Sequence, residues 1–480
     1  MINDINNLIP EGAKYIINMF TQYGHQAYLV GGCVRDIILG RTPNDWDICT
    51  DATPEKMELL VHCMNIHEKE TEEYFVEYGN FYTKRNIKTI PTGLKHGTLT
   101  IVVDDEQYEV TTFRCDGNYS DGRRPDSVSF TNSLINDLQR RDFTINAIAY
   151  HLDEGFIDPF NGMKDIESKI IRCVGNPYER FNEDGLRIMR AVRFSAQLGF
   201  SIEPCTKRAM NQLVDNLNNV SNERINSELC KIMNSNYSYL IIKNIDILCK
   251  IIPEFEDCVH YHQNNPYHIY SVLKHTAVAL IEVINPDLIV NLALLFHDIG
   301  KPQCCTTGED GYFHFKGHGR ISSDMAEAIM KRLKFDNNTI SKVKELVLYH
   351  DATFEVGKKY IKRWLNNIGE EQFRRLLKIR IADVKAQAPE YEKERVSKIT
   401  NILMLLDEVL QEDECFTLKD LAINGKDLMQ HGIPEGKTIG TILNTLLTMV
   451  IDGEINNDKN SLLQMTNLLL QNRGESNVIR

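Results

Sequence analysis

Two aspartates with a short spacing are the strongest chemical signal in the sequence. Asp45 and Asp47 lead into a β-prone run within VGGCVRDIILGRTPNDWDICT, residues 30–50. On a strand, this spacing points both side chains to the same face of a sheet. Two carboxylates side by side repel each other unless a cation lies between them, and oxygen ligands favour magnesium. The pair therefore predicts a divalent metal site.

The residues around the pair favour a phosphate-bearing ligand. Gly31 and Gly32 allow backbone amides to approach a phosphate closely, and the fork of Arg35 matches phosphate oxygens. For an isolated aspartate pair the usual alternative is a solvated turn, and the diglycine and the arginine argue against it. Glu109, in the strand-like run YEVTTF, is either a third carboxylate of the site or a surface glutamate on an edge strand.

A second pair is suited to choosing a nucleotide base. Asp184 and Arg187 are three residues apart and would project from one face of a helix. An aspartate accepts from an exocyclic amino group, and an arginine donates to ring acceptors. Cytosine and adenine match such a pair, whereas uracil and guanine do not, so the two side chains could select CTP and ATP without a template, a reading that the family resemblance given below favours. The alternative is an ordinary surface ion pair.

Histidines and aspartates accumulate further along the chain, where they suggest a separate metal site. HIYSVLKHTAVAL and NLALLFHDIGKP supply His275, His297 and Asp298, which have the chemistry of metal ligands. A cluster of this density is seldom only core packing. The downstream candidates are His318, His350, Asp351 and Asp383.

Short strands followed by helices must position these groups. The runs at 28–32, 46–50, 98–103 and 108–113 are rich in β-formers, and the pattern becomes helical from about residue 160. A helix is expected over 187–200 with Gly199 as its stop. Segment 64–97 is expected to be a long loop, and 423–440 is rich in turn signals.

Length and charge bound the partners. A chain of 480 residues holds about three or four packed modules. The overall net charge of -13 disfavours binding of nucleic acid. Basic clusters such as Arg140-Arg141 and the series Arg187, Arg190, Arg193 nevertheless provide local positive fields. The absence of a long apolar stretch, of a signal-like start and of paired cysteine motifs predicts a cytoplasmic protein with no membrane partner.

Several motifs in order resemble one enzyme family. GGCVRD, the Asp45-Trp46-Asp47 triplet and RRDFTINAIAY (140–150) are similar to the head of polymerase-beta-type nucleotidyltransferases, in the branch of tRNA nucleotidyltransferases and poly(A) polymerases. Further along, FIDPFNGMKDIESKIIR, EDGLRIMRAVRFSA and ERINSEL resemble the neck entry, the nucleotide-selecting helix and a helix-bracing motif. The match covers roughly the first 230 residues.

The resemblance implies a reaction and a set of roles. It implies addition and repair of the 3′-terminal CCA of tRNA from CTP and ATP, with two Mg²⁺ ions at Asp45 and Asp47. It assigns ribose and triphosphate contacts to Arg141, Asp142 and Asn146, with Arg190 among the nucleotide-binding residues. The polar segment 113–130 matches a family loop that helps the site change from CTP to ATP.

The histidine-rich segment resembles the HD superfamily of metal-dependent phosphohydrolases. In that family the first histidine, the HD pair and a late aspartate hold the metal, which implies His275, His297, Asp298 and Asp383 here. His318 and His350 are candidates for a second metal. The implied cofactor is a transition metal, nickel, cobalt, manganese or iron, and the implied activity is phosphoester hydrolysis.

These interpretations predict an α+β protein. A mixed-sheet nucleotidyltransferase head (1–152) precedes a helical neck and body (153–262), an HD domain (263–392) and a helical tail that clamps tRNA (393–480). The expected partners are tRNA, CTP and ATP, with no DNA. Two alternatives remain: a poly(A) polymerase or a CC-only or A-only enzyme, and an HD phosphohydrolase whose inactive head binds RNA.

Overall fold

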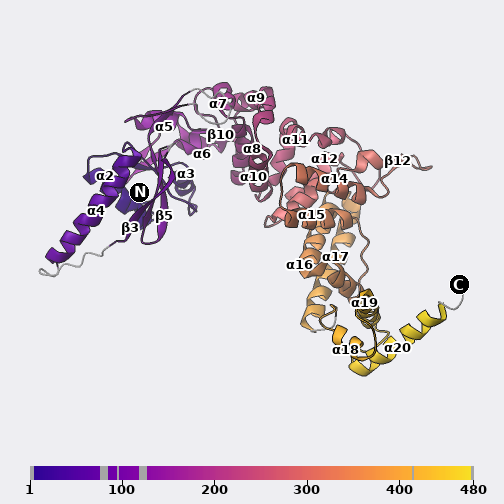
Figure 1. Cartoon of the computed structure of the whole chain (residues 1–480). Coiled ribbons are helices and arrows are strands. Elements are labelled where there is room, and N and C mark those ends of the chain that lie inside the picture. Colours follow the sequence, from indigo (N-terminus) through magenta and orange to yellow (C-terminus); the bar gives the residue numbers. More distant parts are fainter. Residues whose placement is uncertain (1–4, 76–84, 95–96, 118–126, 413–415, 477–480) are drawn as a thin grey trace. The chain divides into compact units, whose positions relative to one another are not determined.

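The chain divides into two compact units in a computed structural model. The structure describes residues 5–75, 85–94, 97–117, 127–412 and 416–476. Unit 1 holds residues 1–232 and 243–251, and unit 2 holds 233–242 and 252–480. The order of their elements is shown in Figure 1.

A seven-stranded mixed sheet forms the centre of unit 1. Its strand order is β3-β4-β5-β2-β1-β8-β9, and β2 and β5 are its one parallel pair of neighbours within the described residues. The strands are β1 (Ala27–Val30), β2 (Asp47–Thr50), β3 (Ile87–Gly93), β4 (Thr98–Val103), β5 (Glu106–Thr112), β8 (Ala149–His151) and β9 (Gly155–Ile157). Three two-stranded pairs lie outside it: β6 (Arg114–Asp116) with β7 (Val128–Phe130), β10 (Ile170–Ile171) with β11 (Ser201–Ile202), and β12 (Thr306–Thr307) with β13 (Phe313–His314).

The strand expectations are confirmed with small shifts at the ends. β4 matches its expected range, and all four residues of β1 are buried, as a central strand requires. The run expected at 28–32 ends earlier, because Gly31 and Gly32 leave the strand and begin a helix. The mixed sheet followed by helices confirms the α+β class.

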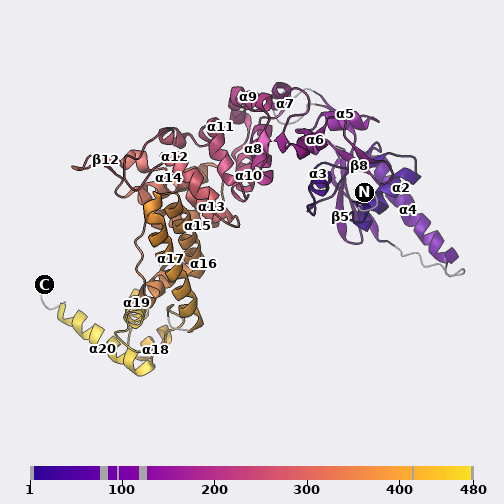
Figure 2. The ribbon, with the colours of Figure 1, turned by 180° about the vertical axis from the view of Figure 1, so that it is seen from behind.

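Helices cover the sheet and continue beyond it. α2 and α4 contact the sheet through β1, β2, β3 and β4, as Figures 1 and 2 show. The helices of this part are α2 (Glu11–Gln22), α3 (Gly32–Ile38), α4 (Pro54–Phe75), α5 (Leu134–Gln139), α6 (Gly162–Glu167), α7 (Pro177–Glu183), α8 (Leu186–Leu198), α9 (Pro204–Gln212), α10 (Asn222–Met233) and α11 (Ile245–Ile251). The 3-10 turns are η2 (Thr144–Asn146), η3 (Val214–Asn219) and η4 (Ser238–Asn244).

α8 ends where the sequence predicts. Gly199 follows it with φ +74°, a left-handed conformation that favours glycine. A buried ion pair ties this helix to α10: Arg193 Nε lies 3.2 Å from Glu228 Oε2. Glu228 belongs to the ERINSEL motif, so the expected bracing contact between helices is present.

The expectation for segment 64–97 is wrong. Residues up to Phe75 continue α4, and Ile87–Gly93 form strand β3, which pairs with β4. Residues 87–93 form a strand because they hydrogen-bond to β4 at the edge of the sheet, a pairing that local sequence composition does not reveal. Residues 76–84 and 95–96 lie outside the described part, as do residues 118–126 of the expected loop at 113–130.

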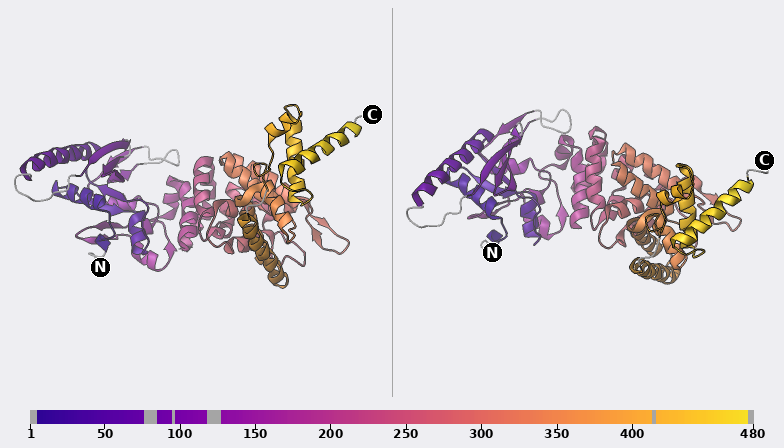
Figure 3. Two further views of the ribbon diagram at one scale, coloured as in Figure 1. Left: turned by 90° about the horizontal axis from the view of Figure 1, so that it is seen from below. Right: turned by 60° about the horizontal axis from the view of Figure 1, so that its bottom comes forward.

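Unit 2 is almost entirely helical. Its helices are α12 (Val272–Ile281), α13 (Leu288–Phe296), α14 (His318–Arg332), α15 (Asn337–Tyr349), α16 (Lys358–Lys385), α17 (Pro389–Gln411), α18 (Gly425–Gln430), α19 (Lys437–Ile451) and α20 (Lys459–Ser476), with 3-10 turns η5 (Pro253–Cys258) and η6 (Lys301–Cys304). The long helices α16 and α17 lie side by side, and α19 contacts both α18 and α20 (Figure 3). Within the described residues, no helix combines the length and apolarity that crossing a membrane requires.

The turn-rich segment near the C-terminus is a packed helical unit. Leu428, Ile433, Ile442 and Leu446 belong to one buried apolar cluster that joins α18, α19 and α20. Its glycines serve turns, since Gly432 has φ +91° and Gly436 caps α19 with φ +149°. The role of this segment in binding tRNA stays a prediction.

Candidate functional sites

The sheet places two carboxylates directly beside each other. β2 and β5 are parallel neighbours with Asp47 opposite Glu109 in register, so both side chains emerge on the same face of the sheet. Asp45 is exposed and lies in a bend just before β2, so Asp47 alone of the aspartate pair belongs to the strand. The expectation that Glu109 lies beside the pair is therefore supported by the strand register.

The electrostatics of Asp47 reflect this crowding. Burial raises its pKa to about 6, and the negative charges of Glu109 and Asp45 add to the rise, while the Arg141 guanidinium opposes it. A carboxyl group that is buried beside two other carboxylates is costly to ionise unless a cation lies near it. Oxygen donors with surplus negative charge fit a hard divalent cation.

Gly31 brings the backbone close to this charge. Its φ of +79° and ψ of -130° occur at the turn from β1 into α3, a conformation that L side chains rarely adopt. A Cβ at this position would lie 3.1 Å from Arg141 Nη1 and 3.7 Å from Asp47 Oδ2. The glycine therefore allows main chain, guanidinium and carboxylate to meet in one place.

Asp137 fixes the two adjacent arginines of the RRDFTINA motif. It is fully buried and accepts from Arg140 Nη2 at 2.7 Å and from Arg141 Nη2 at 3.2 Å. Burial alone would raise the pKa of Asp137, but the two guanidiniums outweigh it and hold that pKa below its usual value. Sequence reasoning missed this residue, although its spacing of three and four residues from the arginines is a recognisable signal.

A continuous polar network joins α3, η2 and α8. Arg35 Nη1 donates to Asn146 Oδ1 at 2.9 Å, Asn146 Nδ2 donates to Asp142 Oδ1 at 3.3 Å, and Arg190 Nε donates to Asp142 Oδ2 at 2.7 Å. Burial opposes ionisation of Asp142, yet Arg190 outweighs it and lowers the pKa of Asp142 to about 2. Four predicted nucleotide-binding residues are thus brought together. In this arrangement Asp142 orients Arg190, and its contact with a ribose stays a prediction.

Asp184 and Arg187 do not share a helix, so that part of the expectation is wrong. α7 ends at Glu183, Asp184 has an extended conformation, and α8 begins at Leu186. The break lies where Gly185 packs against η3, since a Cβ on Gly185 would come within 2.6 Å of the Asn216 carbonyl oxygen. Tertiary packing, and not helix periodicity, positions the two side chains.

Both side chains are nevertheless held firmly. Asp184 accepts from the Leu186 amide at 3.0 Å and from Arg224 Nη2 at 2.8 Å. Arg187 pairs with Glu183 and donates from Nη2 to the Arg140 carbonyl at 3.1 Å. Sequence reasoning missed Arg224, because the residue that orients Asp184 comes from α10, 40 positions away.

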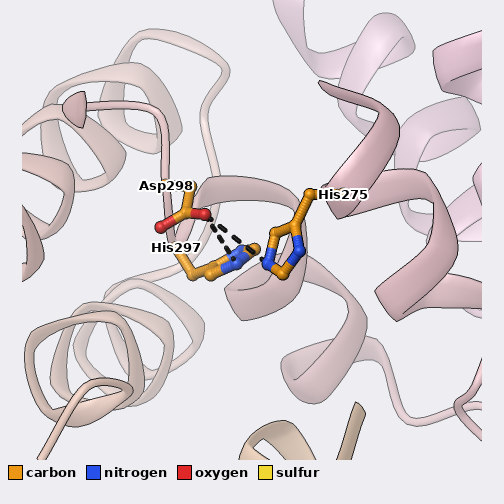
Figure 4. Close-up of side chains that lie close together, drawn as sticks. All are labelled: His275, His297 and Asp298. Carbon is orange, nitrogen blue, oxygen red and sulfur yellow. Dashed lines mark ion pairs between the residues drawn. The ribbon is translucent and has the colours of Figure 1, made fainter. Parts of the chain in front are cut away.

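The six histidines and aspartates predicted as metal ligands are buried together in unit 2. They are His275 on α12, His297 and Asp298 after α13, His318 at the start of α14, His350 after α15, and Asp383 on α16. Figure 4 shows the Asp298 carboxylate facing the rings of His275 and His297. Asp351, also noted in the sequence, is exposed.

Asp298 lies at the centre of two overlapping ligand sets. His275, His297 and Asp298 form one, and Asp298, His318 and His350 form the other. Asp298 Oδ2 lies 3.6 Å from His275 Nε2 and 3.2 Å from His297 Nε2, while Oδ1 lies 3.4 Å from His318 Nε2 and 3.7 Å from His350 Nε2. Each carboxylate oxygen therefore faces its own pair of imidazoles.

Backbone carbonyls fix the tautomer of all four rings. The Nδ1 atoms of His275, His297, His318 and His350 lie 3.1, 2.6, 2.8 and 2.7 Å from carbonyl oxygens. A carbonyl can only accept, so each Nδ1 carries a proton, and Nε2 is the ring atom left to bind a metal. Nε2 atoms that converge while each Nδ1 donates to the backbone are typical of metal-binding histidines.

Two further residues border this cluster. Buried Lys301 donates from Nζ to Asp298 Oδ2 and to Gln263 Oε1, both at 2.7 Å. The ring of His268 lies edge-on to that of His275, with centroids 5.2 Å apart. Sequence reasoning did not select them, although Lys301 lies only three residues after Asp298.

Three cations within residues 358–363 form ion pairs at the surface of unit 2. Lys358 pairs with Glu412 at 2.5 Å, and Lys359 and Arg363 both pair with Asp452, at 3.2 and 2.8 Å.

Comparisons with known proteins agree with the ordered motifs. Residues 27–81 and 71–172 match the family described as Poly A polymerase head domain, and residues 199–257 match a probable RNA and SrmB-binding site of polymerase A. Residues 306–466 match a family described as tRNA nucleotidyltransferase domain 2, putative. The CCA-adding enzyme of Levilactobacillus brevis is 32% identical over 456 residues, which cover 94% of this chain and 96% of that protein.

The chain belongs to the family of CCA-adding enzymes. The enzyme of Bacillus subtilis is 31% identical over 92% of this chain and 94% of its own length. The crystal structure of the Bacillus stearothermophilus CCA-adding enzyme in complex with CTP has a TM-score of 0.68 and 28% identity, covering 97% of this chain and 98% of that one. The resemblance to this nucleotidyltransferase family is thereby confirmed, and the resemblance to HD phosphohydrolases stays a prediction.

Replacing Asp47 by asparagine is expected to stabilise the metal-free protein in a pH-dependent way. The folded-state pKa of about 6 lies above the unfolded value of about 4. Ionisation of Asp47 therefore lowers the free energy of unfolding by its full amount above pH 6, and this loss disappears as the pH falls toward 4. Asp47→Asn should therefore be more stable by about 2–3 kcal/mol above pH 6, with little difference near pH 4.

Trp46 fluorescence reports this change if Trp364→Phe is introduced as the background, since the chain has two tryptophans. Urea midpoints are measured with a chelator present. Asp153→Asn, at an exposed aspartate, is the control and should give no pH-dependent gain. A gain at Asp47 that stays constant from pH 4 to 8 would contradict the electrostatic cause.

Proposed function

We propose that the chain adds and repairs the 3′-terminal CCA of tRNA without a nucleic-acid template, using CTP and ATP and releasing pyrophosphate. The observation that carries the proposal is the in-register pair of Asp47 and Glu109 beside Arg141, in a chain that belongs to the CCA-adding family. CCA-adding enzymes that align with this chain over more than nine-tenths of both sequences favour this activity over that of a poly(A) polymerase.

The carboxylates suit divalent ions. Asp45, Asp47 and Glu109 offer only oxygen ligands, which fit Mg²⁺ better than a softer metal, and burial together with the charges of Glu109 and Asp45 raises the pKa of Asp47. When bound, two such ions would activate the RNA 3′-hydroxyl and neutralise charge on the triphosphate.

The protein's own residues bind and orient the nucleotide. Arg141, next to Gly31, presents positive charge to the phosphates, while Asp137 on its far side keeps the guanidinium in place. Arg35 and Arg190 are both oriented by the network through Asn146 and Asp142. Hydrogen bonds that fix both guanidiniums reduce the rearrangement needed to receive a triphosphate.

Base selection is assigned to Asp184 and Arg187. Arg224 and the start of α8 hold the Asp184 carboxylate, and Glu183 holds the Arg187 guanidinium. A fixed acceptor and a fixed donor can pair with the amino group and ring acceptor of cytosine or adenine. Uracil or guanine would leave these groups unpaired, which is the strong form of discrimination.

Loss of the carboxylates is expected to abolish nucleotide addition. With tRNA lacking its CCA end and single labelled nucleotides, the parent protein should add CMP and then AMP, and Asp45→Ala with Asp47→Ala should lower the rate at least about a thousandfold. Asp153→Ala, at an exposed site, is the control. Normal extension by the double variant would refute the proposal, long A tracts would indicate a poly(A) polymerase, and addition of one nucleotide type only would indicate a CC-only or A-only enzyme.

Loss of either base-selecting side chain is expected to relax specificity. Asp184→Ala and Arg187→Ala should reduce discrimination against UTP and GTP by about a hundredfold or more, measured as ratios of kcat/KM in the same assay. Arg224→Ala should show the same change more weakly, because it only orients Asp184. Lys207→Ala, an exposed residue on α9, should keep full discrimination. Unchanged selectivity in the first two variants would remove the assignment.

A second function is favoured by the buried cluster in unit 2. Four Nε2 atoms and two carboxylates meet there, and His275 Nε2 also lies 3.0 Å from Asp383 Oδ1. Such a set of nitrogen and oxygen donors fits a transition metal such as nickel, cobalt, manganese or iron. Bound metal would supply a nucleophilic water to hydrolyse a phosphoester. In that reaction the water oxygen bonds to phosphorus, the P–O ester bond breaks, and the departing oxygen takes up a proton.

Metal binding at the cluster can be measured directly. The purified protein is expected to hold about two equivalents of transition metal by elemental analysis, one for each ligand set. Asp298→Asn should lose both, because Asp298 belongs to both sets, whereas His350→Gln should lose one. His314→Gln, whose side chain is 48% exposed, is the control. Absence of bound metal together with no phosphatase activity on addition of nickel, cobalt or manganese would refute this function, and nucleotide addition to tRNA should be unaffected throughout.

A further inference from the structure

One buried phenylalanine of unit 1 lies where three arginines meet. Phe194, on α8, is 5% exposed. The guanidinium carbons of Arg193, Arg35 and Arg190 lie over its ring, at 4.2, 5.3 and 5.4 Å from the ring centroid. Arg190 and Arg193 belong to α8, whereas Arg35 comes from α3. The ring therefore joins two helices that each carry a predicted nucleotide-binding arginine.

The three guanidiniums repel one another, so an arrangement that keeps them close needs a stabilising partner. Burial lowers the pKa of Arg193 to about 10, and the positive charges of Arg190 and Arg35 contribute to this drop. The face of an aromatic ring carries partial negative charge and attracts a guanidinium that lies within about 6 Å of its centroid. Phe194 offers this attraction to all three arginines at once.

The three arginines differ in what they are free to contact. The side chain of Arg193 is 9% exposed and pairs with Glu228 at 3.2 Å, so it is an internal contact between α8 and α10. The side chains of Arg35 and Arg190 are 12% and 34% exposed. The ring thus carries one cation that the protein neutralises internally and two that keep part of their surface open to a ligand.

The ring itself is held in a fixed orientation. Phe143, from the RRDFTINA motif, is fully buried and meets Phe194 edge to face, with ring centroids 5.7 Å apart at an interplanar angle of 79°. Phe143 directly follows Asp142, which accepts from Arg190. An edge-to-face contact on one side leaves the position of the ring well defined for the cations around it.

We propose that Phe194 is a positioning residue that holds Arg35 and Arg190 together for the triphosphate of the incoming nucleotide. The inference rests on the nucleotidyl transfer proposed above and concerns how its triphosphate is bound. Because the ring is buried, it acts through the arginines: its attraction offsets part of their mutual repulsion, so that both guanidiniums can bind one anion. Base selection, assigned to Asp184 and Arg187, should not depend on the ring.

Graded fluorination of the ring separates its charge from its packing. Phe194 is replaced site-specifically by 4-fluoro-, 3,5-difluoro- and 3,4,5-trifluorophenylalanine, which withdraw electrons from the ring face and nearly keep its shape. Calorimetry of the full-length protein with magnesium measures Kd for inorganic tripolyphosphate and for CTP. Both Kd values should rise stepwise along the series, by about tenfold for the trifluoro ring and for Phe194→Leu. The same replacements at Phe200, 4% exposed just after α8, are the matched control and should change neither.

The outcomes separate this inference from the proposed function. Kd values that stay constant along the fluorinated series, or that change only in Phe194→Leu, show a packing role and overturn the inference. A rise for CTP without one for tripolyphosphate, or a changed ratio of kcat/KM between CTP and UTP, also overturns it, because the ring is assigned to the phosphates alone. Tripolyphosphate binding needs no tRNA, so a parent protein that binds it but adds no CMP refutes the proposed function and still decides the role of Phe194. A parent that binds no tripolyphosphate refutes the inference.

Discussion

Carboxylates that the fold gathers beside other ligand-type side chains are the feature on which both sites depend. In unit 1, strand register forces Asp47 against Glu109, and burial makes the repulsion costly enough to raise the Asp47 pKa to about 6. In unit 2, four imidazole rings and two carboxylates meet at one buried point, where His297 and Lys301 hold the pKa of Asp298 well below its usual range. A fold maintains such arrangements against their electrostatic cost when a cation relieves them.

The surrounding residues act mainly to hold charged groups in place. Asp137 fixes Arg140 and Arg141, Asp142 fixes Arg190, and backbone carbonyls fix the four rings in unit 2. Each contact occupies one part of a side chain, so that a different, defined atom of the same side chain is left to face a ligand. Preorganisation of this kind lowers the cost of binding, because the side chains need not lose rotational freedom when the ligand arrives.

The two units solve the positioning problem with different architecture. In unit 1 a parallel pair of neighbouring strands sets the distance between carboxylates, and a left-handed glycine admits the arginine beside them. In unit 2 five helices or helix ends each supply one or two ligands to a common centre. A sheet gives exact register between neighbours, whereas a helical bundle can gather donors from many directions into its core.

The sequence alone determined the residue types and the local elements. Asp45, Asp47, the diglycine, the histidines and the ordered motifs were recognisable, because spacing along a strand or helix and the chemistry of side chains are local properties. Only the tertiary structure decided which groups meet: Glu109 with Asp47 through strand register, Arg224 with Asp184 across 40 residues, and the break at Gly185 that separates Asp184 from the helix of Arg187. Packing and strand pairing between segments distant in sequence decide such contacts, and no periodicity within a single segment records them.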